Sequence, residues 1–440
     1  MESKGQTAGR LHGVRRWSHL AEGSSGRSIV RIGLALIVVG SLVGIIVPAG
    51  TGWDFANFYD AGRRAASGEL STLYEAGAPI GGESAEGGMM FWGTPLSAYL
   101  YVPLASFAPG AALTIFKIAN VLALFGALAM IFLSFREFAP DREAFAVSFV
   151  VAALLFQPFW TIFRVGGQST PFAFVLLVGA LLAHPRERFF LSWALFAGAV
   201  MIKPILAPGL IFLLAFSGRR AFLAAIPVGI GFLAVSLLTA GWTSHVKFLG
   251  RMSAGADTMR DWWFNSALAQ PFVYLPSLVG LDPGDGPHVL YRIMLWLSAI
   301  AVIAAATRLV LTGIRHDLPA RGRLHLTCLV ALTLPVLIVP IAWEHYLAFL
   351  FPLFMFVLAS RSRIGDAAVA VATVAVVLAV GQNLILVMAV AEAVGWDRGV
   401  IGFGLSALKS APGWLAAWLL WKHRNELVDA HAGMSFGRAA

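Results

Sequence analysis

Asp54 is the residue of this sequence whose type and position point most directly to chemistry. It lies about six residues beyond the first long apolar run, in the stretch from Gly52 to Tyr74. Acidic residues are rare next to hydrocarbon unless they have a function. A carboxylate can accept a proton from a hydroxyl group. We therefore take Asp54 as a candidate general base at the boundary between water and lipid.

Further polar side chains follow other apolar runs, where helices are expected to end at the same face of the membrane. Arginine and lysine hold phosphate through charge-assisted hydrogen bonds. Gathered around Asp54, such groups would provide a base for an acceptor hydroxyl and a clamp for a departing phosphate. That combination suits transfer of a sugar from a lipid phosphate. The candidates are Arg164, Gln168, Lys203, Glu344 and His345.

The stretch after Asp54 offers three more candidates for substrate binding, namely Tyr59, Asp60 and Arg63. Residues in this stretch can also have purely structural roles. Asp54 can cap a helix or pair with Arg63 or Arg64. For Asp60 a structural role is favoured, as an N-cap or as a partner of those arginines.

The later candidates have structural alternatives too. Lys203 can extend toward water along its apolar stem, although the following Pro204 favours a special turn. Arg164 can anchor a helix at the membrane interface. His345 can be an ordinary turn residue, although the neighbouring Trp343 and Glu344 favour a functional role.

Composition assigns the chain to the membrane proteins. Hydrophobic residues make up 58% of its 440 residues and charged residues only 12%, with a mean hydropathy of +0.78. Soluble proteins carry about 25% charged residues. The apolar residues form runs near the roughly 20 residues that cross a bilayer as a helix. We predict an all-α polytopic membrane protein.

The net charge of +9 does not indicate a nucleic-acid partner. The arginines gather in loops on the side of the N-terminus, which is the bias of cytoplasmic loops in membrane proteins. We expect a multi-pass protein of a bacterial inner (plasma) membrane with both termini in the cytoplasm. The arginines concerned include Arg15, Arg16, Arg186, Arg188, Arg219, Arg220, Arg321, Arg323, Arg361 and Arg363.

Twelve apolar runs predict about twelve transmembrane helices. They begin near residues 29, 110, 143, 171, 189, 204, 221, 288, 324, 346, 366 and 401. We expect a cytoplasmic tail over residues 1–28, one transmembrane domain over 29–421 and a second cytoplasmic tail over 422–440. The first run is expected to remain as an anchor, because no clear cleavage site follows it.

Two long regions are expected on the outer (periplasmic) face, over residues 49–94 and 241–287. The second contains the sequence DWWFN from Asp261 to Asn265, whose tryptophans suit a membrane interface. The proline-containing residues 94–109 are ambiguous and could form a short helix that enters the membrane.

Residues 189–216 predict a broken pair of short helices, because basic sequences precede and follow them. Two helices of about 14 residues would reach about 21 Å each, less than a hydrocarbon core of about 30 Å. Pro204 cannot continue a helix, so the turn falls at Lys203. Such a pair is tolerated where it lines a cavity. We expect Lys203 at the floor of an outward-facing cavity.

Motifs of several other kinds of site are missing from the sequence. It has no P-loop, no GxGxxG in a βαβ context, no HExxH and no Asp-x-Asp. Cys328 is its one cysteine, which excludes an intrachain disulfide and a zinc site of cysteines. We expect no cofactor and no metal.

A pattern of motifs links the chain to a known family. Gln168 in a Gly-Gln pair, Lys203 in a Lys-Pro pair and Trp343 in a Trp-x-His-Tyr sequence follow the family's order. The chain resembles glycosyltransferase family 87 over roughly residues 30–420. The chain departs from the family's pattern after Gln168, where Ser169 and Thr170 stand in a place that commonly has an asparagine in the family. The most specific motif reads Asp54-Phe55, Phe58-Tyr59, Ala61-Gly62, Gly68 and Leu73-Tyr74.

The resemblance implies a fold of the GT-C type and a transferase embedded in the bilayer. It implies a polyprenyl-phosphate sugar donor, usually of mannose, and a cell-envelope glycolipid or glycan as acceptor. It also implies that the first acid after the first helix, Asp54, is the general base. We expect an inverting single displacement in which Lys203 and Arg164 stabilise the departing phosphate, with a further contribution from His345.

Two other functions stay open at this point. The first is a transporter or flippase for a lipid-linked or small solute, although internal repeats and charges near the bilayer midplane, which transporters favour, are not evident. The second is a polymerase or ligase of surface glycans, which usually has a larger late outer loop. The long region after the first helix favours the transferase.

Overall fold

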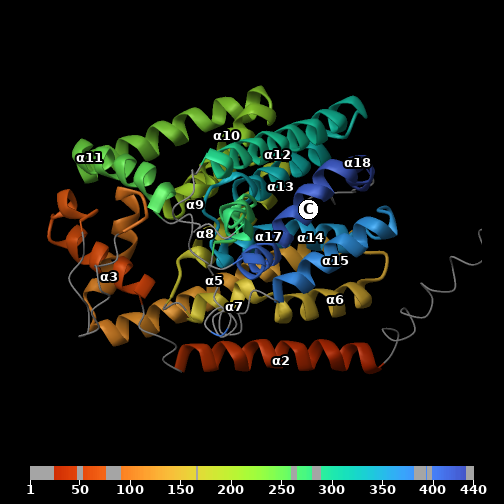
Figure 1. Cartoon of the computed structure of the whole chain (residues 1–440), viewed down its shortest axis with the longest axis horizontal. Coiled ribbons are helices and arrows are strands. Elements are labelled where there is room, and N and C mark those ends of the chain that lie inside the picture. Colours follow the sequence, from red (N-terminus) through yellow and green to blue (C-terminus); the bar gives the residue numbers. More distant parts are fainter. Residues whose placement is uncertain are drawn as a thin grey trace, which may run out of the picture.

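The computed structural model describes residues 24–46, 53–75, 91–164, 167–258, 265–279, 289–380, 393 and 399–432, and in these parts helices joined by short turns and loops make up the fold. Within these ranges there are no β-strands, and a single bridge joins Asn265 to Trp343. Figure 1 shows α2 along one side of the molecule and α11 along the opposite side. The end that carries α3 lies far from the end that carries α18.

The α-helices differ widely in length. Short 3-10 helices connect them, among them η1 (Leu70–Thr72), η2 (Pro95–Tyr101), η4 (Pro204–Leu206) and η7 (Glu344–Leu350). The α-helices are α2 (Ser24–Ile46), α3 (Trp53–Ala66), α4 (Val102–Ala105), α5 (Pro109–Phe135), α6 (Arg142–Leu155), α7 (Gln157–Arg164), α8 (Thr170–Ala183), α9 (Phe189–Ile202), α10 (Ala207–Phe216), α11 (Arg219–Thr258), α12 (Val289–Arg315), α13 (Ala320–Ile338), α14 (Phe351–Ala359), α15 (Asp366–Val380), α17 (Gly399–Lys422) and α18 (Arg424–Ala432).

Five of the described helices are long and apolar enough to cross a membrane, namely α2, α5, α11, α12 and α13. Several shorter apolar helices accompany them, α8, α9 and α10 among them. The prediction of a polytopic all-α membrane protein is therefore confirmed. Every one of the twelve predicted starts lies within a few residues of a helix, but length and composition alone qualify only five as spans.

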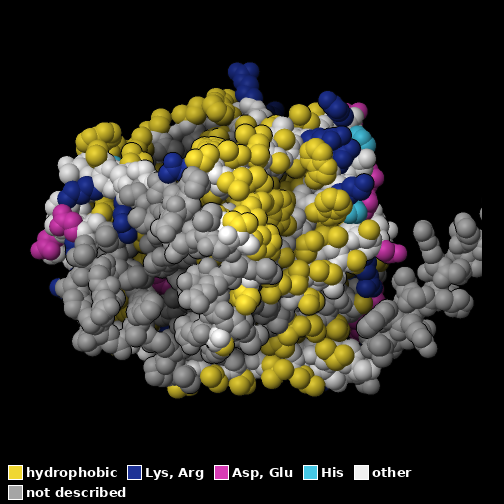
Figure 2. All heavy atoms as spheres, viewed as in Figure 1, with side chains coloured by type: hydrophobic (Ala, Val, Ile, Leu, Met, Phe, Trp, Pro, Cys, Tyr) yellow, Lys and Arg dark blue, Asp and Glu magenta, His cyan; other side chains and the backbone are white. Residues whose placement is uncertain are grey.

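The outer surface of the helices suits a lipid environment. Large apolar side chains on α2, α11 and α12 are exposed, such as Leu42, Leu238 and Trp296. Figure 2 shows hydrophobic side chains across the middle of the visible face, while basic side chains gather at the end that carries α18. This distribution is the one expected of a chain whose middle contacts hydrocarbon.

The predicted outer region over residues 241–287 starts at a kink within α11, and its first part is helical as far as Thr258. The side of the membrane on which this region lies stays a prediction. Gly241 has a φ of 73° and a ψ of 161°, which are not helical values, so α11 consists of two helical parts that meet at a kink. The residues after Gly241 have sufficient helix propensity to resume the helix. Trp262 and Trp263 of the predicted interfacial segment lie outside the described residues.

The largest core surrounds α13 and α14. Buried residues of these helices include Leu332 and Phe354, and α13 packs against α10 and α12. Gly209 allows the close approach of α10, since a Cβ atom there would lie 2.0 Å from the carbonyl oxygen of Ala331. This core holds the elements that form one wall of the cavity described below.

A second, smaller core holds α3 against η2 and the start of α5. Phe55, Phe58, Tyr101 and Phe116 are buried there and their rings contact one another. Gly62 makes the contact possible, because a Cβ atom at this position would lie 2.4 Å from the carbonyl oxygen of Tyr101. Several residues of the motif after Asp54 are therefore structural and fix the helix that begins with the acid.

Candidate active site

A cavity of about 470 Å³ opens between the smaller core and the main core. Its lining comes from segments far apart in the sequence: the start of α3, the loop before η2, the residue before α8, the break after α9, the second half of α11 and the loop after α13. Asp54 and Lys203 are its charged residues, Asn57, Thr94, Gln168 and Tyr346 add polar groups, and most other lining side chains are apolar or aromatic. The cavity thus brings together two charged groups that lie 149 positions apart in the sequence.

Gln168 connects the acid and the cation of this cavity. The Lys203 ammonium donates a hydrogen bond of 2.9 Å to Oε1 of Gln168. The Gln168 side chain also forms a hydrogen bond with the Asp54 carboxylate. Because Oε1 accepts from Lys203, the amide nitrogen is the group that donates to Asp54. The three side chains form a chain from carboxylate to amide to ammonium.

The Asp54 carboxyl is poised to take up a proton near neutral pH. Its helix, α3, lies outside the five candidate spans. Burial raises the pKa of Asp54 to about 6, although the nearby charge of Lys203 and the Gln168 hydrogen bond act in the opposite direction. A base works best when its pKa lies close to the operating pH. The local environment therefore suits Asp54 to accept a proton from a hydroxyl.

The position of Lys203 follows from the break between α9 and α10. α9 ends at Ile202, Lys203 adopts an extended conformation, and Pro204 starts the short η4 helix. This confirms the predicted interruption at Lys203. The ammonium lies 5.3 Å from the Tyr346 ring centroid and 5.9 Å from that of Phe58, so two aromatic faces help to hold the buried cation.

Gln168 reaches the cavity because the chain turns sharply before α8. Gly167 has a φ of 89°, a region that residues with a Cβ atom rarely adopt. A Cβ atom at this position would also lie 3.0 Å from the Phe116 ring. The glycine of the Gly-Gln pair therefore has a structural role, because it allows the turn that directs the following glutamine into the cavity.

Three predicted candidates on α3 lie outside the lining of the cavity. Tyr59 donates a hydrogen bond of 2.8 Å to the carbonyl oxygen of Phe107. Asp60 pairs with Arg64 at 2.7 Å. Arg63 is exposed. Their observed contacts fit the structural interpretation of this stretch, in which they hold α3 in place.

The other three predicted candidates are Arg164, Glu344 and His345, and the two described side chains among them, those of Glu344 and His345, do not line the cavity either. Arg164 ends α7, and its side chain lies outside the described part of the structure. Glu344 is buried and accepts a hydrogen bond of 2.5 Å from the Lys409 ammonium of α17. His345 is buried next to Tyr346, and its Nε2 atom has no hydrogen-bond partner among the described residues. Glu344 and His345 therefore lie behind the wall of the cavity that Trp343 and Tyr346 form.

A further cation, which nothing in the sequence singles out, lies beside the cavity. Arg251 lies on α11 between the lining residues Phe248 and Met252, and its guanidinium lies 4.1 Å from the ring centroid of Trp92. The Nε atom of Arg251 is buried and has no hydrogen-bond partner in the described residues. No motif marks this arginine, and it lies in the region predicted as an outer loop.

The loop after α13 is fixed to the rest of the protein by a buried asparagine. Oδ1 of Asn265 accepts hydrogen bonds from the backbone nitrogens of Ala267 and Ala342, at 3.0 and 2.9 Å. Its Nδ2 atom donates to the carbonyl oxygen of Pro340 and to Gln270. Asn265 thus holds in place a stretch that lines the cavity.

Comparison with known proteins identifies the family. The model of glycosyltransferase family 87 matches residues 91–340, which is more than half of the chain. The chain belongs to glycosyltransferase family 87. Among curated proteins, no significant match is found. The matched range contains Gln168, Lys203 and Arg251, whereas Asp54 and Trp343 lie outside it.

Family membership and the apolar helices together identify a membrane glycosyltransferase. The transferase prediction is therefore confirmed at the level of this activity, and the family gives no support to the transporter alternative. A glycosyltransferase moves a sugar from a donor to an acceptor, and the cavity around Asp54 is the candidate site for this reaction.

Proposed function

We propose that this family 87 glycosyltransferase moves a sugar, most simply mannose, from a polyprenyl phosphate to a hydroxyl of a cell-envelope glycolipid or glycan. The observation that carries the proposal is the linkage of Asp54, Gln168 and Lys203 in one cavity. A carboxylate and an ammonium at opposite ends of one amide provide a proton acceptor and a phosphate-binding group in a single site.

The proposed reaction is a single displacement with inversion at the anomeric carbon. Asp54 takes the proton of the acceptor hydroxyl as its oxygen forms a bond to the anomeric carbon. The bond between that carbon and the phosphate oxygen breaks, and the polyprenyl phosphate leaves with the electron pair. Lys203 stabilises the negative charge that grows on this oxygen. Since Gln168 contacts both residues, it keeps the base and the cation in a fixed relation.

Arg251 is the second cation that we assign to the donor phosphate. Trp92 holds its guanidinium against the cavity, and its Nε atom has unused hydrogen-bonding capacity among the described residues. A guanidinium can bind two phosphate oxygens at once, which a lysine cannot do. In this proposal Lys203 acts on the leaving oxygen and Arg251 orients the rest of the phosphate.

The apolar walls of the cavity suit a lipid-linked substrate. Val200, Ile205, Met252 and Ile341 line it together with aromatic residues. Polyprenyl chains are hydrocarbon, so burial of their first isoprene units against such walls would stabilise the complex. The hydroxyl acceptor would then approach from the side of Asp54.

We further propose a GT-C arrangement in which all twelve predicted helices, over residues 29–421, form one membrane domain. The short helices α9 and α10 would enter the bilayer without crossing it completely. The cavity would face the periplasm of an inner membrane, opposite the arginine-rich loops. Labelling of single cysteines at positions 69 and 363 by an impermeant reagent tests this, with reaction expected only at position 69 in intact spheroplasts.

The reaction itself is tested with the purified full-length protein in nanodiscs. Radiolabelled polyprenyl-phosphate mannose is supplied with a lipid extract from cell envelopes, using the native protein and the variant Asp54→Asn. We expect label in an acceptor with the native protein and none above background with the variant. Transfer only from a nucleotide sugar would overturn the proposed donor, and an active Asn variant would overturn the proposed base.

A further inference from the structure

A second groove, of about 620 Å³, lies along α12 and is not part of the candidate active site. Its lining residues on α12 recur every three or four positions from Ile300 to Arg315, which places them on one face of the helix, and His316 follows directly after the helix. The face changes character along its length. Ile300 and Ile303 are exposed apolar residues, whereas Arg308, Arg315 and His316 follow toward the C-terminal end.

The groove lies at the end of the molecule opposite the active-site cavity. Tyr291, near the start of α12, donates a hydrogen bond of 3.1 Å to the carbonyl oxygen of Pro340, which lines that cavity. α12 has 27 residues, so its basic end lies roughly 35–40 Å away at about 1.5 Å per residue. In Figure 1, α18, whose first residues also line the groove, lies at the end of the molecule away from α3.

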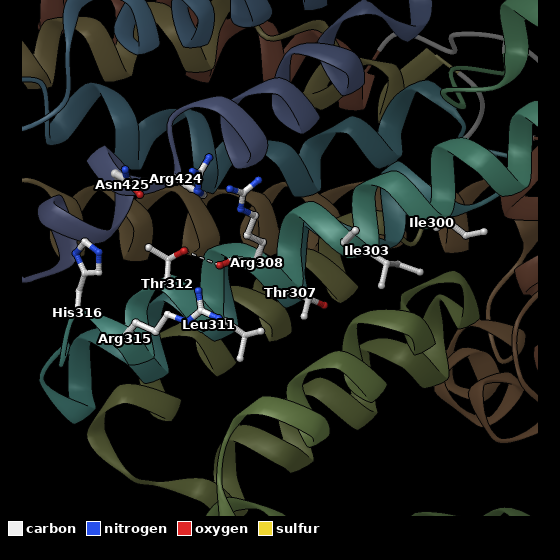
Figure 3. A pocket seen from close by; sticks show the side chains of 11 residues that line it. Ile300, Ile303, Thr307, Arg308, Leu311, Thr312, Arg315, His316, Arg424 and Asn425 are labelled. Atoms are coloured by element: carbon white, nitrogen blue, oxygen red, sulfur yellow. Dashed lines mark hydrogen bonds between the residues drawn. The ribbon is translucent and has the colours of Figure 1, made fainter.

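Two of the arginines in this groove are held in place by one tryptophan. The guanidinium of Arg308 lies 5.3 Å from the ring centroid of Trp421 on α17. Nη1 of Arg424, at the start of α18, donates a hydrogen bond of 3.2 Å to the carbonyl oxygen of Trp421. Figure 3 shows Arg308 extending from α12 toward Arg424. The two cations are therefore positioned before any ligand arrives.

The charges of the groove are not neutralised by the rest of the described chain. Arg308, Arg315 and Arg424 form no ion pair with any described residue. The acids closest to them in sequence, Asp317 and Glu426, do not line the groove. Glu426 instead contacts His423 at 3.0 Å. Three cations in one place repel one another, so an anion bound between them would be stabilised.

The dimensions of the groove match one leaflet of a bilayer. From Ile300 to Arg308 the helix rises about 12 Å, close to half of a hydrocarbon core of about 30 Å. A phosphate among Arg308, Arg315 and Arg424 would therefore lie at the level of the lipid headgroups. The acyl chains of the same molecule would lie along Ile300, Ile303 and the small residue Ala304.

We propose that this groove binds one anionic diacyl phospholipid, whose phosphate contacts Arg308, Arg315 and Arg424 and whose acyl chains lie along α12. The groove combines three guanidiniums, two of them positioned by Trp421, with an exposed apolar face that a soluble anion would not need. This combination favours a phospholipid as the occupant. Anionic headgroups near a membrane surface gain about 1 kcal/mol per basic residue. The inference does not depend on the reaction proposed for the other cavity.

Native mass spectrometry of the full-length protein in detergent tests the proposal. Phosphatidylglycerol and phosphatidylcholine with the same acyl chains are titrated separately, followed by glycerol phosphate and a polyprenyl phosphate. The variants are Arg308→Gln with Arg424→Gln in the groove, and Arg219→Gln with Arg220→Gln, two exposed arginines elsewhere. We expect phosphatidylglycerol to bind the native protein and the control, and to bind the groove variant on the order of tenfold more weakly.

Other results would overturn the proposal. Equal binding of phosphatidylcholine would show that charge does not select the lipid, and an equal loss in the Arg219/Arg220 control would show a general charge effect. Equal binding of glycerol phosphate, or stronger binding of polyprenyl phosphate, would replace the proposed occupant. If the groove variant does not fold, a Trp421→Leu variant, which removes only the stacking on Arg308, should weaken phosphatidylglycerol binding by a smaller factor.

Discussion

The Lys203 ammonium and the Gln168 amide oxygen lie 2.9 Å apart, although 35 residues separate them in the chain. This contact joins the break after α9 to the turn before α8, and through Gln168 it reaches Asp54. The hydrogen bond assigns Gln168 a definite orientation. Its nitrogen faces the acid and its oxygen faces the cation, so a substitution by glutamate would place a like charge beside Asp54.

Replacement of Asp54 by asparagine is expected to abolish most transfer while the fold is retained. Asparagine has nearly the same shape but cannot accept the acceptor's proton, and loss of a general base costs roughly 10²–10⁴-fold in rate. The measurement is label transfer at saturating donor. Asp60→Asn is the matched control, because Asp60 pairs with Arg64 outside the cavity lining, and it should retain most activity. Equal loss in both variants would argue against a base at Asp54.

Transfer is expected to depend on pH through Asp54. Burial raises the pKa of this carboxyl to about 6, and only its deprotonated form can act as a base. The ratio kcat/KM should therefore fall about tenfold for each pH unit below 6 and level off above it. Initial rates between pH 4.5 and 8, with folding monitored in parallel, provide the test. A flat profile below pH 6 would contradict the assignment.

Lys203→Met is expected to slow transfer by roughly 10²–10³-fold, because the departing phosphate loses a hydrogen-bonding cation. Methionine keeps much of the apolar length of the side chain, and Tyr346 and Phe58 can still pack around it. A donor with a better leaving group should lose less activity in this variant than the natural donor. If both donors were affected equally, Lys203 would not act on the leaving oxygen.

Arg251→Gln should weaken donor binding more than it lowers the maximal rate. We expect KM for the polyprenyl-phosphate sugar to rise about tenfold or more, since a charge-assisted hydrogen bond contributes about 1.5–3 kcal/mol. Lys247→Gln is the control from the same helix, because Lys247 pairs with Glu75, whereas Arg251 stacks on Trp92, which lines the cavity. An unchanged KM in Arg251→Gln would remove this arginine from the site.

The buried pair of Glu344 and Lys409 is expected to stabilise the fold rather than bind substrate. Lys409→Met leaves the Glu344 carboxylate buried without its ammonium partner, which costs about 3–5 kcal/mol. Thermal unfolding in nanodiscs should show a clearly lower Tm. The double variant Glu344→Gln with Lys409→Met should recover much of that loss. No recovery would mean that each residue has separate essential contacts.

Much of the architecture was predictable because bilayer spans impose long apolar runs. The predicted starts near residues 110 and 288 agree with α5 and α12, and the interruption at Lys203 follows directly from Pro204. The kink at Gly241 falls where the outer region was predicted to start, but the helical structure of the residues that follow, up to Thr258, was not predictable in this way. A glycine in a turn and a glycine in a bent helix look alike in a sequence, and only packing distinguishes them.

Residues of the candidate site were predictable only where a polar or charged residue type stands out after an apolar run. Asp54, Gln168 and Lys203 stand out as polar residues after apolar runs, and the structure brings them together. Arg251 carries no such signal, because exposed arginines are common and only its contact with Trp92 distinguishes it. Glu344 was selected by type, but its partner Lys409 is 65 positions away and cannot be inferred from a single sequence.

The candidate site lies between two separate cores, so its two sides can move apart. Phe55 next to the acid belongs to the smaller core, whereas Ile202 and Leu206 beside Lys203 belong to the main one. Segments with their own small core can open without unfolding the whole protein. A substrate that contacts Asp54 and Lys203 together would bind only the closed arrangement and would favour it by mass action. Donor binding to the candidate site should therefore slow amide hydrogen exchange in α3, so hydrogen exchange would measure both occupancy of the site and local opening of this helix.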